Sequence, residues 1–159
     1  MKSLLFLKLA VVLCFLTSCN NKEKDVPMNS TTQKDKDFYI KEALTKGDTS
    51  AYQNLRTYYM DYPIDGILYP ALVMANKHGF HSAYADVYYA LTSHDHKQGV
   101  SELEDLDETT RKMALEYLIK GAEKKDKECQ AILGHHYLDG KYVEKDTVKG
   151  NRLIKIGER

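Results

Sequence analysis

Six histidines could bind a metal ion, because neutral imidazole is a common zinc ligand. His94 and His96 flank Asp95 and form the best candidate pair. A catalytic zinc site needs three protein ligands, and no third ligand follows at a recognisable spacing. His135 and His136 are adjacent, so on a helix they would point about 100° apart. The sequence predicts no metal and no other cofactor. A small metal-dependent hydrolase that uses His94 and His96 is the alternative from the enzyme class.

Motifs of common enzyme classes are absent from the sequence. There is no Gly-x-Ser-x-Gly, no HExxH and no glycine-rich phosphate loop. The acidic run Glu102–Asp107 lacks the alternating oxygen ligands and the turn glycine of a calcium-binding EF-hand. A charged loop that ends at a helix cap, Asp107, explains this run better. We therefore predict that the protein is not an enzyme.

The N-terminus carries the clearest chemical signal, which centres on Cys19. Residues 1–18 begin with Lys2 and continue into a short apolar run that ends in small residues, which is typical of a signal peptide. The run is far shorter than the roughly 20 apolar residues of a membrane span. The ending Leu-Thr-Ser-Cys19 resembles a bacterial lipobox, which implies that Cys19 becomes the lipid-carrying first residue of the mature chain. An ordinary N-terminal helix with a chance cysteine is the alternative.

Lipidation would place the protein in a bacterial cell envelope, anchored to a membrane. Asn20 follows Cys19, and the absence of the inner-membrane retention residue Asp favours the outer membrane, facing the periplasm or the cell surface. Residues 19–36 are rich in Asn, Ser, Thr and Lys, so we predict a flexible tether there. Residues 37–159 then form one domain.

The net charge and the cysteine content bear on the possible partners and on disulfide bonds. Loss of residues 1–18 removes Lys2 and Lys8, and the formal net charge falls from zero to −2. Such a chain has no electrostatic attraction for nucleic acid, so we expect no nucleic-acid partner. Cys129 would be the one internal cysteine of the mature chain, which leaves no internal disulfide. Its place on an apolar helical face predicts a buried packing residue.

The domain shows the apolar spacing of successive helices and an internal repeat. Gly47–Ala51 matches Gly79–Ala83 at a spacing of 32 residues, and Lys125–Cys129 follows 46 residues later. Each copy has an aliphatic residue four positions on and a bulky residue eight positions on, which is one face of a helix. These residues are Leu55, Val87 and Leu133, followed by Tyr59, Leu91 and Tyr137. The insertion His94–Asp107 accounts for the longer second interval. Chance periodicity in a Tyr-rich helical chain is the alternative.

The segment Ala114–Asp146 resembles a Sel1-like repeat, a relative of the tetratricopeptide repeat. The matching residues are Gly121-Ala122, Cys129 at the usual Ala, Leu133-Gly134, Tyr137, Gly140, Val143 and Asp146. Lys125 and Tyr142 depart from the pattern, since both replace glycines. The resemblance implies an all-α fold, a short right-handed solenoid of helical hairpins with about six or seven helices.

The same resemblance implies that the first helix of each hairpin lines a concave groove that binds another protein. The chain has twelve Tyr and no Trp, and Tyr is enriched at binding surfaces. Tyr52, Tyr84 and Tyr89 lie on first helices but off the repeat face, so we predict that they bind the partner; packing in the core is the alternative. An immunity protein that neutralises a toxic effector is a sharper form of this hypothesis, and no residue selects it.

Overall fold

The computed structural model describes residues 32–60, 64–92 and 103–158. The chain divides into two compact units, Met1–Ser30 and Thr31–Arg159, and the described residues all belong to the second. The predicted signal peptide, Cys19 and most of the predicted tether lie outside the described residues. The same holds for His94 and His96.

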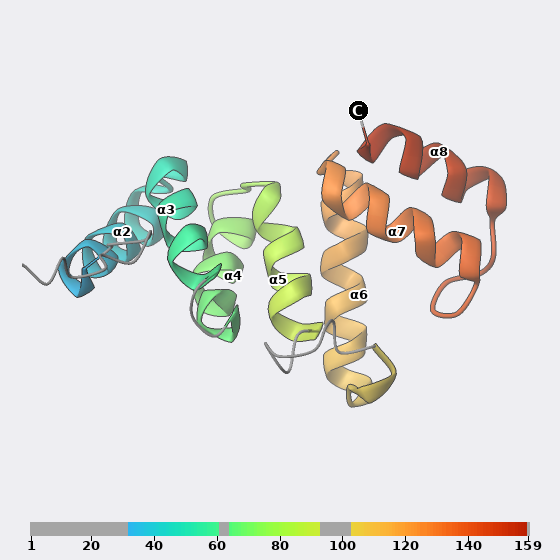
Figure 1. Cartoon of the computed structure of the whole chain (residues 1–159), viewed down its shortest axis with the longest axis horizontal. Helices are drawn as coiled ribbons and strands as arrows, with labels where there is room; N and C mark the ends of the chain where they lie inside the picture. Colours follow the sequence, from blue (N-terminus) through green and yellow to red (C-terminus); the bar gives the residue numbers. More distant parts are fainter. Residues whose placement is uncertain (1–31, 61–63, 93–102, 159) are drawn as a thin grey trace, which may run out of the picture. The chain divides into compact units, whose positions relative to one another are not determined.

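The described residues form seven α-helices, two short 3₁₀ turns and no strand (Figure 1). In chain order these are α2 (Gln33–Lys46), α3 (Thr49–Met60), η1 (Ile64–Ile67), α4 (Leu68–Asn76), α5 (Ser82–Thr92), η2 (Leu103–Asp105), α6 (Glu108–Glu123), α7 (Lys127–Asp139) and α8 (Thr147–Gly157). The prediction of an all-α fold with about six or seven helices is confirmed. No helix among the described residues has the length and apolar content that crossing a bilayer requires.

Helices that follow one another along the chain pack against one another. α2 packs on α3, α4 on α5, α5 on α6, α6 on α7, and α7 on α8. Contacts also join alternate helices, α2 with α4 and α5 with α7. Pairing with both the next helix and the next but one is compatible with a short helical solenoid.

The repeat found in the sequence corresponds to a repeated backbone geometry. Gly47, Gly79 and Lys125 have φ angles of 70°, 67° and 66°, so each repeat copy begins with a left-handed residue. This conformation suits glycine and costs a side-chain-bearing residue roughly 1–2 kcal/mol. Lys125 therefore adopts the conformation that Gly47 and Gly79 have at the aligned positions.

The apolar face of the repeat is buried as predicted. The small residues Ala51, Ala83 and Cys129 are buried, as are the aliphatic residues Leu55, Val87 and Leu133 four positions on. The bulky residues eight positions on, Tyr59, Leu91 and Tyr137, are half-buried. The three first helices α3, α5 and α7 thus present equivalent faces to the core.

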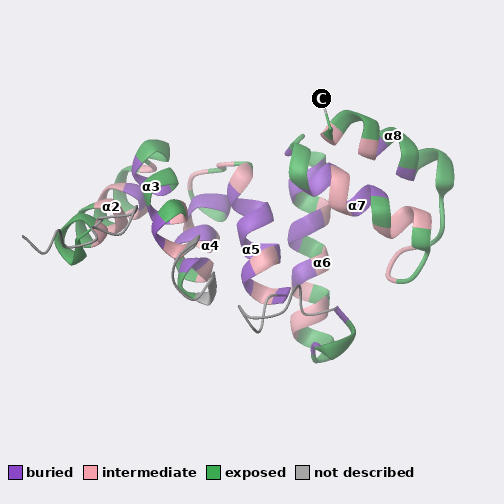
Figure 2. Ribbon diagram, viewed as in Figure 1, coloured by how far each residue is buried: buried purple, intermediate pink, exposed green. Residues whose placement is uncertain are grey.

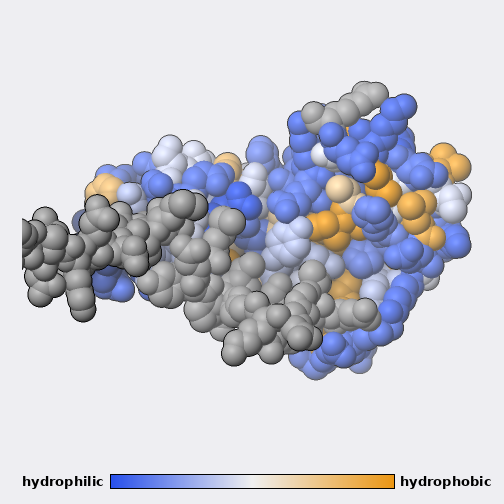
Figure 3. Space-filling model, viewed as in Figure 1, coloured by the Kyte–Doolittle hydropathy of each residue, from blue (hydrophilic) through white to orange (hydrophobic). Residues whose placement is uncertain are grey.

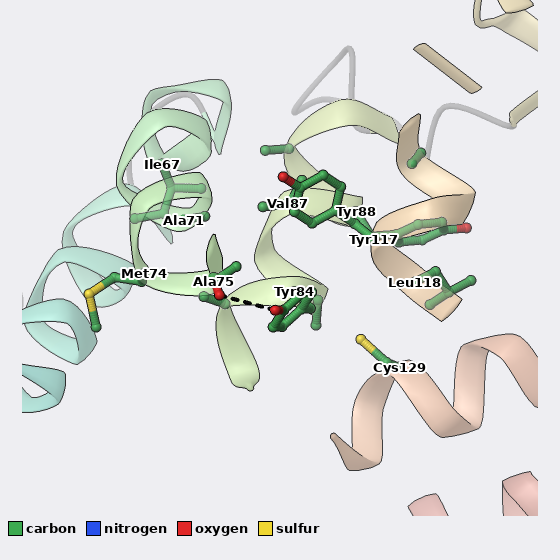
Figure 4. Close-up of a cluster of buried hydrophobic side chains, with 14 of the residues drawn as sticks. Ile67, Ala71, Met74, Ala75, Tyr84, Val87, Tyr88, Tyr117, Leu118 and Cys129 are labelled. Carbon is green, nitrogen blue, oxygen red and sulfur yellow. Dashed lines mark hydrogen bonds between the residues drawn. The ribbon is translucent and has the colours of Figure 1, made fainter. Parts of the chain in front are cut away.

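The core centres on α5, which is buried on nearly every side (Figure 2). Val87 and Tyr88 project from it among side chains of α4 and α6, and Cys129 of α7 lies beyond Leu118 (Figure 4). The hydroxyl of Tyr84 donates a hydrogen bond of 3.0 Å to the backbone oxygen of Ala75, which ties α5 to α4. In the view of Figure 3, the described surface is mostly hydrophilic, and hydrophobic residues gather over the C-terminal helices.

Helix α2 begins earlier than the sequence suggested. Residues 33–36, which we assigned to the tether, form its first turn. Thr32 accepts a hydrogen bond from the backbone N–H of Asp35, and the Asp35 carboxylate accepts one from the backbone N–H of Thr32. This capping box satisfies two backbone donors that polar composition alone did not reveal.

The glycines of the last hairpin serve close packing. A Cβ on Gly134 would lie 2.9 Å from the backbone oxygen of Gly150 and 2.7 Å from Ile154 Cγ1. A Cβ on Gly157 would lie 2.5 Å from the backbone oxygen of Lys127. Glycine weakens a helix, but the missing side chains of Gly150 and Gly157 let the backbones of α7 and α8 approach.

Candidate functional site

A pocket of about 290 Å³ opens between α3 and α5. Its lining comes from both helices and from the end of η1, and consists of Gln53, Arg56, Thr57, Tyr59, Ile67, Asp86 and Tyr89. Two aromatic rings and Ile67 supply apolar walls, while an amide, a guanidinium and a carboxylate supply polar groups. Such a mixture is typical of a recognition pocket.

A buried carboxylate, Asp86, organises the polar side of this pocket. Only 7% of the surface of Asp86 is exposed to solvent. The Tyr52 hydroxyl donates to Asp86 Oδ2 over 2.7 Å, and Arg56 Nε donates to Oδ1 over 2.9 Å. Arg56 Nη1 donates further to Gln53 Oε1 over 3.2 Å. The network links α3 to α5 and fixes the plane of the guanidinium.

Burial and pairing act on Asp86 in opposite directions. Burial raises the pKa of its carboxyl, and the Arg56 guanidinium and the Tyr52 hydroxyl offset part of that rise. Burial also raises the pKa of the Tyr52 hydroxyl, and the neighbouring Asp86 carboxylate adds to the effect. Tyr52 therefore stays a neutral hydrogen-bond donor.

Tyr89 extends the site toward α7. Its ring is half-buried and lines the pocket, and its hydroxyl donates a 3.0 Å hydrogen bond to Glu128 Oε1 on α7. Burial, followed by the charge of Glu128, raises the pKa of the Tyr89 hydroxyl. The pocket is thereby connected to all three first helices, α3, α5 and α7.

The three tyrosines predicted to bind a partner have different surroundings. Tyr52 is fully buried and Tyr84 is 4% exposed, so neither presents its ring to a partner in this structure. The Tyr52 hydroxyl donates a hydrogen bond to Asp86, and the Tyr84 hydroxyl donates one to the backbone oxygen of Ala75. The expectation that these two face a groove is wrong, because their apolar rings fill the space between α5 and its neighbours. Tyr89 lines the pocket between α3 and α5, and neither Tyr52 nor Tyr84 belongs to the lining of that pocket.

The described histidines are dispersed. His78 Nε2 lies 3.0 Å from the Leu44 backbone oxygen, and His136 Nε2 lies 3.2 Å from the Tyr88 hydroxyl. His135 is exposed, so the adjacent pair diverges. Within the described ranges, no three potential metal ligands come together. Cys129 is buried and free of disulfide, and burial raises the pKa of its thiol.

The sequence reasoning missed Arg56 and Asp86. One signal was present: Asp86 is the single charged residue in the apolar helix Ser82–Thr92. An acid at such a position is rarely buried without a partner. Its partners lie 30 and 34 residues earlier in the chain, so spacing could not identify them.

Comparison of the chain with protein-family models, curated proteins and solved structures finds no match.

Proposed function

We propose that this chain is a lipid-anchored, Sel1-like envelope protein that binds another protein along α3, α5 and α7. The pocket between α3 and α5 is the anchor point, where one side chain of the partner inserts. The observation that carries the proposal is the guanidinium of Arg56, held by Asp86 and Gln53 at the wall of that pocket.

A fixed guanidinium suits recognition. Two of its nitrogens are engaged, and its Nη2 has no hydrogen-bond partner within the described part of the chain. The Arg56 side chain is 32% exposed, so part of it is open to solvent at the wall of the pocket. Because its partners already hold the side chain in place, binding loses little additional rotamer entropy.

The apolar walls supply the other half of an interface anchor. Tyr59, Ile67 and Tyr89 surround the polar groups. Arg and Tyr are the residue types that contribute most to binding energy at protein interfaces, especially in partly enclosed pockets. A volume of about 290 Å³ suits one side chain of a partner rather than a large cofactor.

Site-specific photo-cross-linking in the producing cell tests the proposal. A photoreactive residue at Thr57, which is exposed and lines the pocket, is compared with one at Glu116, which is exposed on α6. We expect a discrete protein adduct from position 57 that is lost when Tyr89→Ala is added, and no such adduct from position 116. Adducts of equal yield from both positions, or none from position 57, would refute the pocket as the docking site.

A further inference from the structure

A second surface, on α2 and α4, combines exposed aromatic residues with lysines. Phe38 on α2 is 58% exposed and Tyr69 on α4 is 67% exposed. Lys34 and Lys41 stand four residues before and three residues after Phe38, so they share its side of α2, and both are exposed. We call these four residues the α2–α4 surface.

The two helices pack side by side and run in the same direction. At one end, the Leu44 backbone oxygen accepts a 3.1 Å hydrogen bond from Lys77 Nζ. At the other end, the Lys36 ammonium lies 5.3 Å from the centre of the Tyr59 ring, which itself lies against Gly66 just before α4. Phe38 and Tyr69 therefore lie at similar heights on neighbouring helices.

The charges on this surface are unbalanced in favour of lysine. Lys34 and Lys41 have no ion-pair partner among the residues that the structure describes, whereas Glu42 is paired with Lys46 over 2.6 Å. The Asp35 carboxylate is occupied by the Thr32 cap, and the exposed Asp37 carboxylate beside Phe38 accepts a 2.8 Å hydrogen bond from Gln33 Nε2. Residues 66–80, which include α4, contain no acidic residue. Aromatic rings beside unpaired lysines suit the interface of an anionic bilayer.

The position of the surface along the chain selects a membrane over other occupants. Residues 20–31 separate the proposed lipid attachment at Cys19 from the α2 cap Thr32. Fully extended, that segment spans at most about 45 Å. A short tether raises the effective concentration of the surface at the bilayer to roughly millimolar, so even a weak contact is populated.

We propose that the α2–α4 surface contacts the anionic phospholipid surface to which the chain is anchored. Phe38 and Tyr69 enter the interface between headgroups and acyl chains, and Lys34 and Lys41 contact the phosphates. This inference rests on the proposed lipid anchor. It is independent of the pocket between α3 and α5.

The absence of Trp from the sequence provides a direct test. The full-length protein is purified in its processed form, carries Phe38→Trp as its single Trp, and is reconstituted into phosphatidylcholine vesicles with or without phosphatidylglycerol. A matched variant carries Val148→Trp, because Val148 on α8 is 80% exposed and also has basic neighbours. We expect a blue shift and quenching by brominated lipid for Phe38→Trp in anionic vesicles, and neither for Val148→Trp. Adding Lys34→Gln and Lys41→Gln should lower the ratio of docked to undocked protein by about fivefold for each lysine.

Three results would overturn the proposal. One is an emission of Phe38→Trp that is the same with and without vesicles. The second is an equal shift for Val148→Trp, which would show unspecific adsorption. The third is a concentration-dependent shift without vesicles, which would identify a second copy of the chain as the occupant. Mass spectrometry of Cys19 tests the anchor separately, and an unmodified Cys19 would overturn the premise of the inference rather than the contact itself.

Discussion

Replacement of Asp86 by Ala tests the network that holds α3 to α5. The change leaves the Tyr52 hydroxyl without its 2.7 Å acceptor in a fully buried position. A buried hydroxyl that loses its partner costs about 1–3 kcal/mol. Arg56 also loses its carboxylate, but its side chain is 32% exposed and can turn to water, so its share is smaller. We expect Asp86→Ala to lower the free energy of unfolding by about 2–4 kcal/mol.

The assay is urea unfolding followed by circular dichroism, with a double-mutant cycle as its control. In a Tyr52→Phe background there is no hydroxyl to strand, so Asp86→Ala should cost about 1–2 kcal/mol less than in the wild type. A cost below about 0.5 kcal/mol for Asp86→Ala, or the same cost in both backgrounds, would refute the reasoning.

Four further predictions address other parts of the molecule. Lys125→Gly should raise the free energy of unfolding by about 0.5–1 kcal/mol, because Lys125 has φ 66°, whereas Gly47→Ala should lower it; urea midpoints that move the other way would contradict the repeat geometry. Gly134→Ala should lower it by about 1–3 kcal/mol by separating α7 from α8, and an unchanged midpoint would show that the helices adjust freely. Burial lowers the pKa of His136, so its contribution to the free energy of unfolding is full above the ordinary histidine pKa and is lost as pH falls below it. When the pH is lowered through about 6.5, the free energy of unfolding should therefore fall more in the wild type than in His136→Gln. Cys129 should react with a thiol reagent only after unfolding, measured with Cys14→Ser and Cys19→Ser in place, and rapid labelling of the folded protein would contradict its burial.

The sequence was sufficient to predict the all-α architecture because similar local requirements recur along the chain. Gly47 and Gly79 marked the left-handed positions, and Ala51 and Ala83 marked the buried face that follows. Lys125 could be aligned with them although its side chain disfavours the conformation that it adopts. The caps Asp107 and Asp146 were likewise predictable, since an Asp before an apolar helical stretch has a local role.

The site was less predictable, because its geometry depends on contacts between distant segments. Helical spacing placed Tyr52 and Tyr84 away from the repeat face, but α5 is enclosed by its neighbours, so being off that face did not mean being exposed. Asp86 obtains its partners from α3, and no local pattern encodes that pairing. Tyr89 remains half-buried at the pocket, whereas Tyr52 and Tyr84 are buried. This difference depends on how the helices pack, which local spacing does not reveal.

The central claim is that a partner protein docks at the pocket between α3 and α5. The most direct test is to measure, by isothermal titration calorimetry, how tightly the partner identified by cross-linking binds pocket variants. We predict that Tyr89→Ala weakens binding by at least about tenfold, as expected for an interface anchor, while Glu116→Ala on α6 leaves the affinity unchanged. Circular dichroism of each variant confirms that the fold is intact. Equal affinities for wild type and Tyr89→Ala would show that the partner binds elsewhere on the protein.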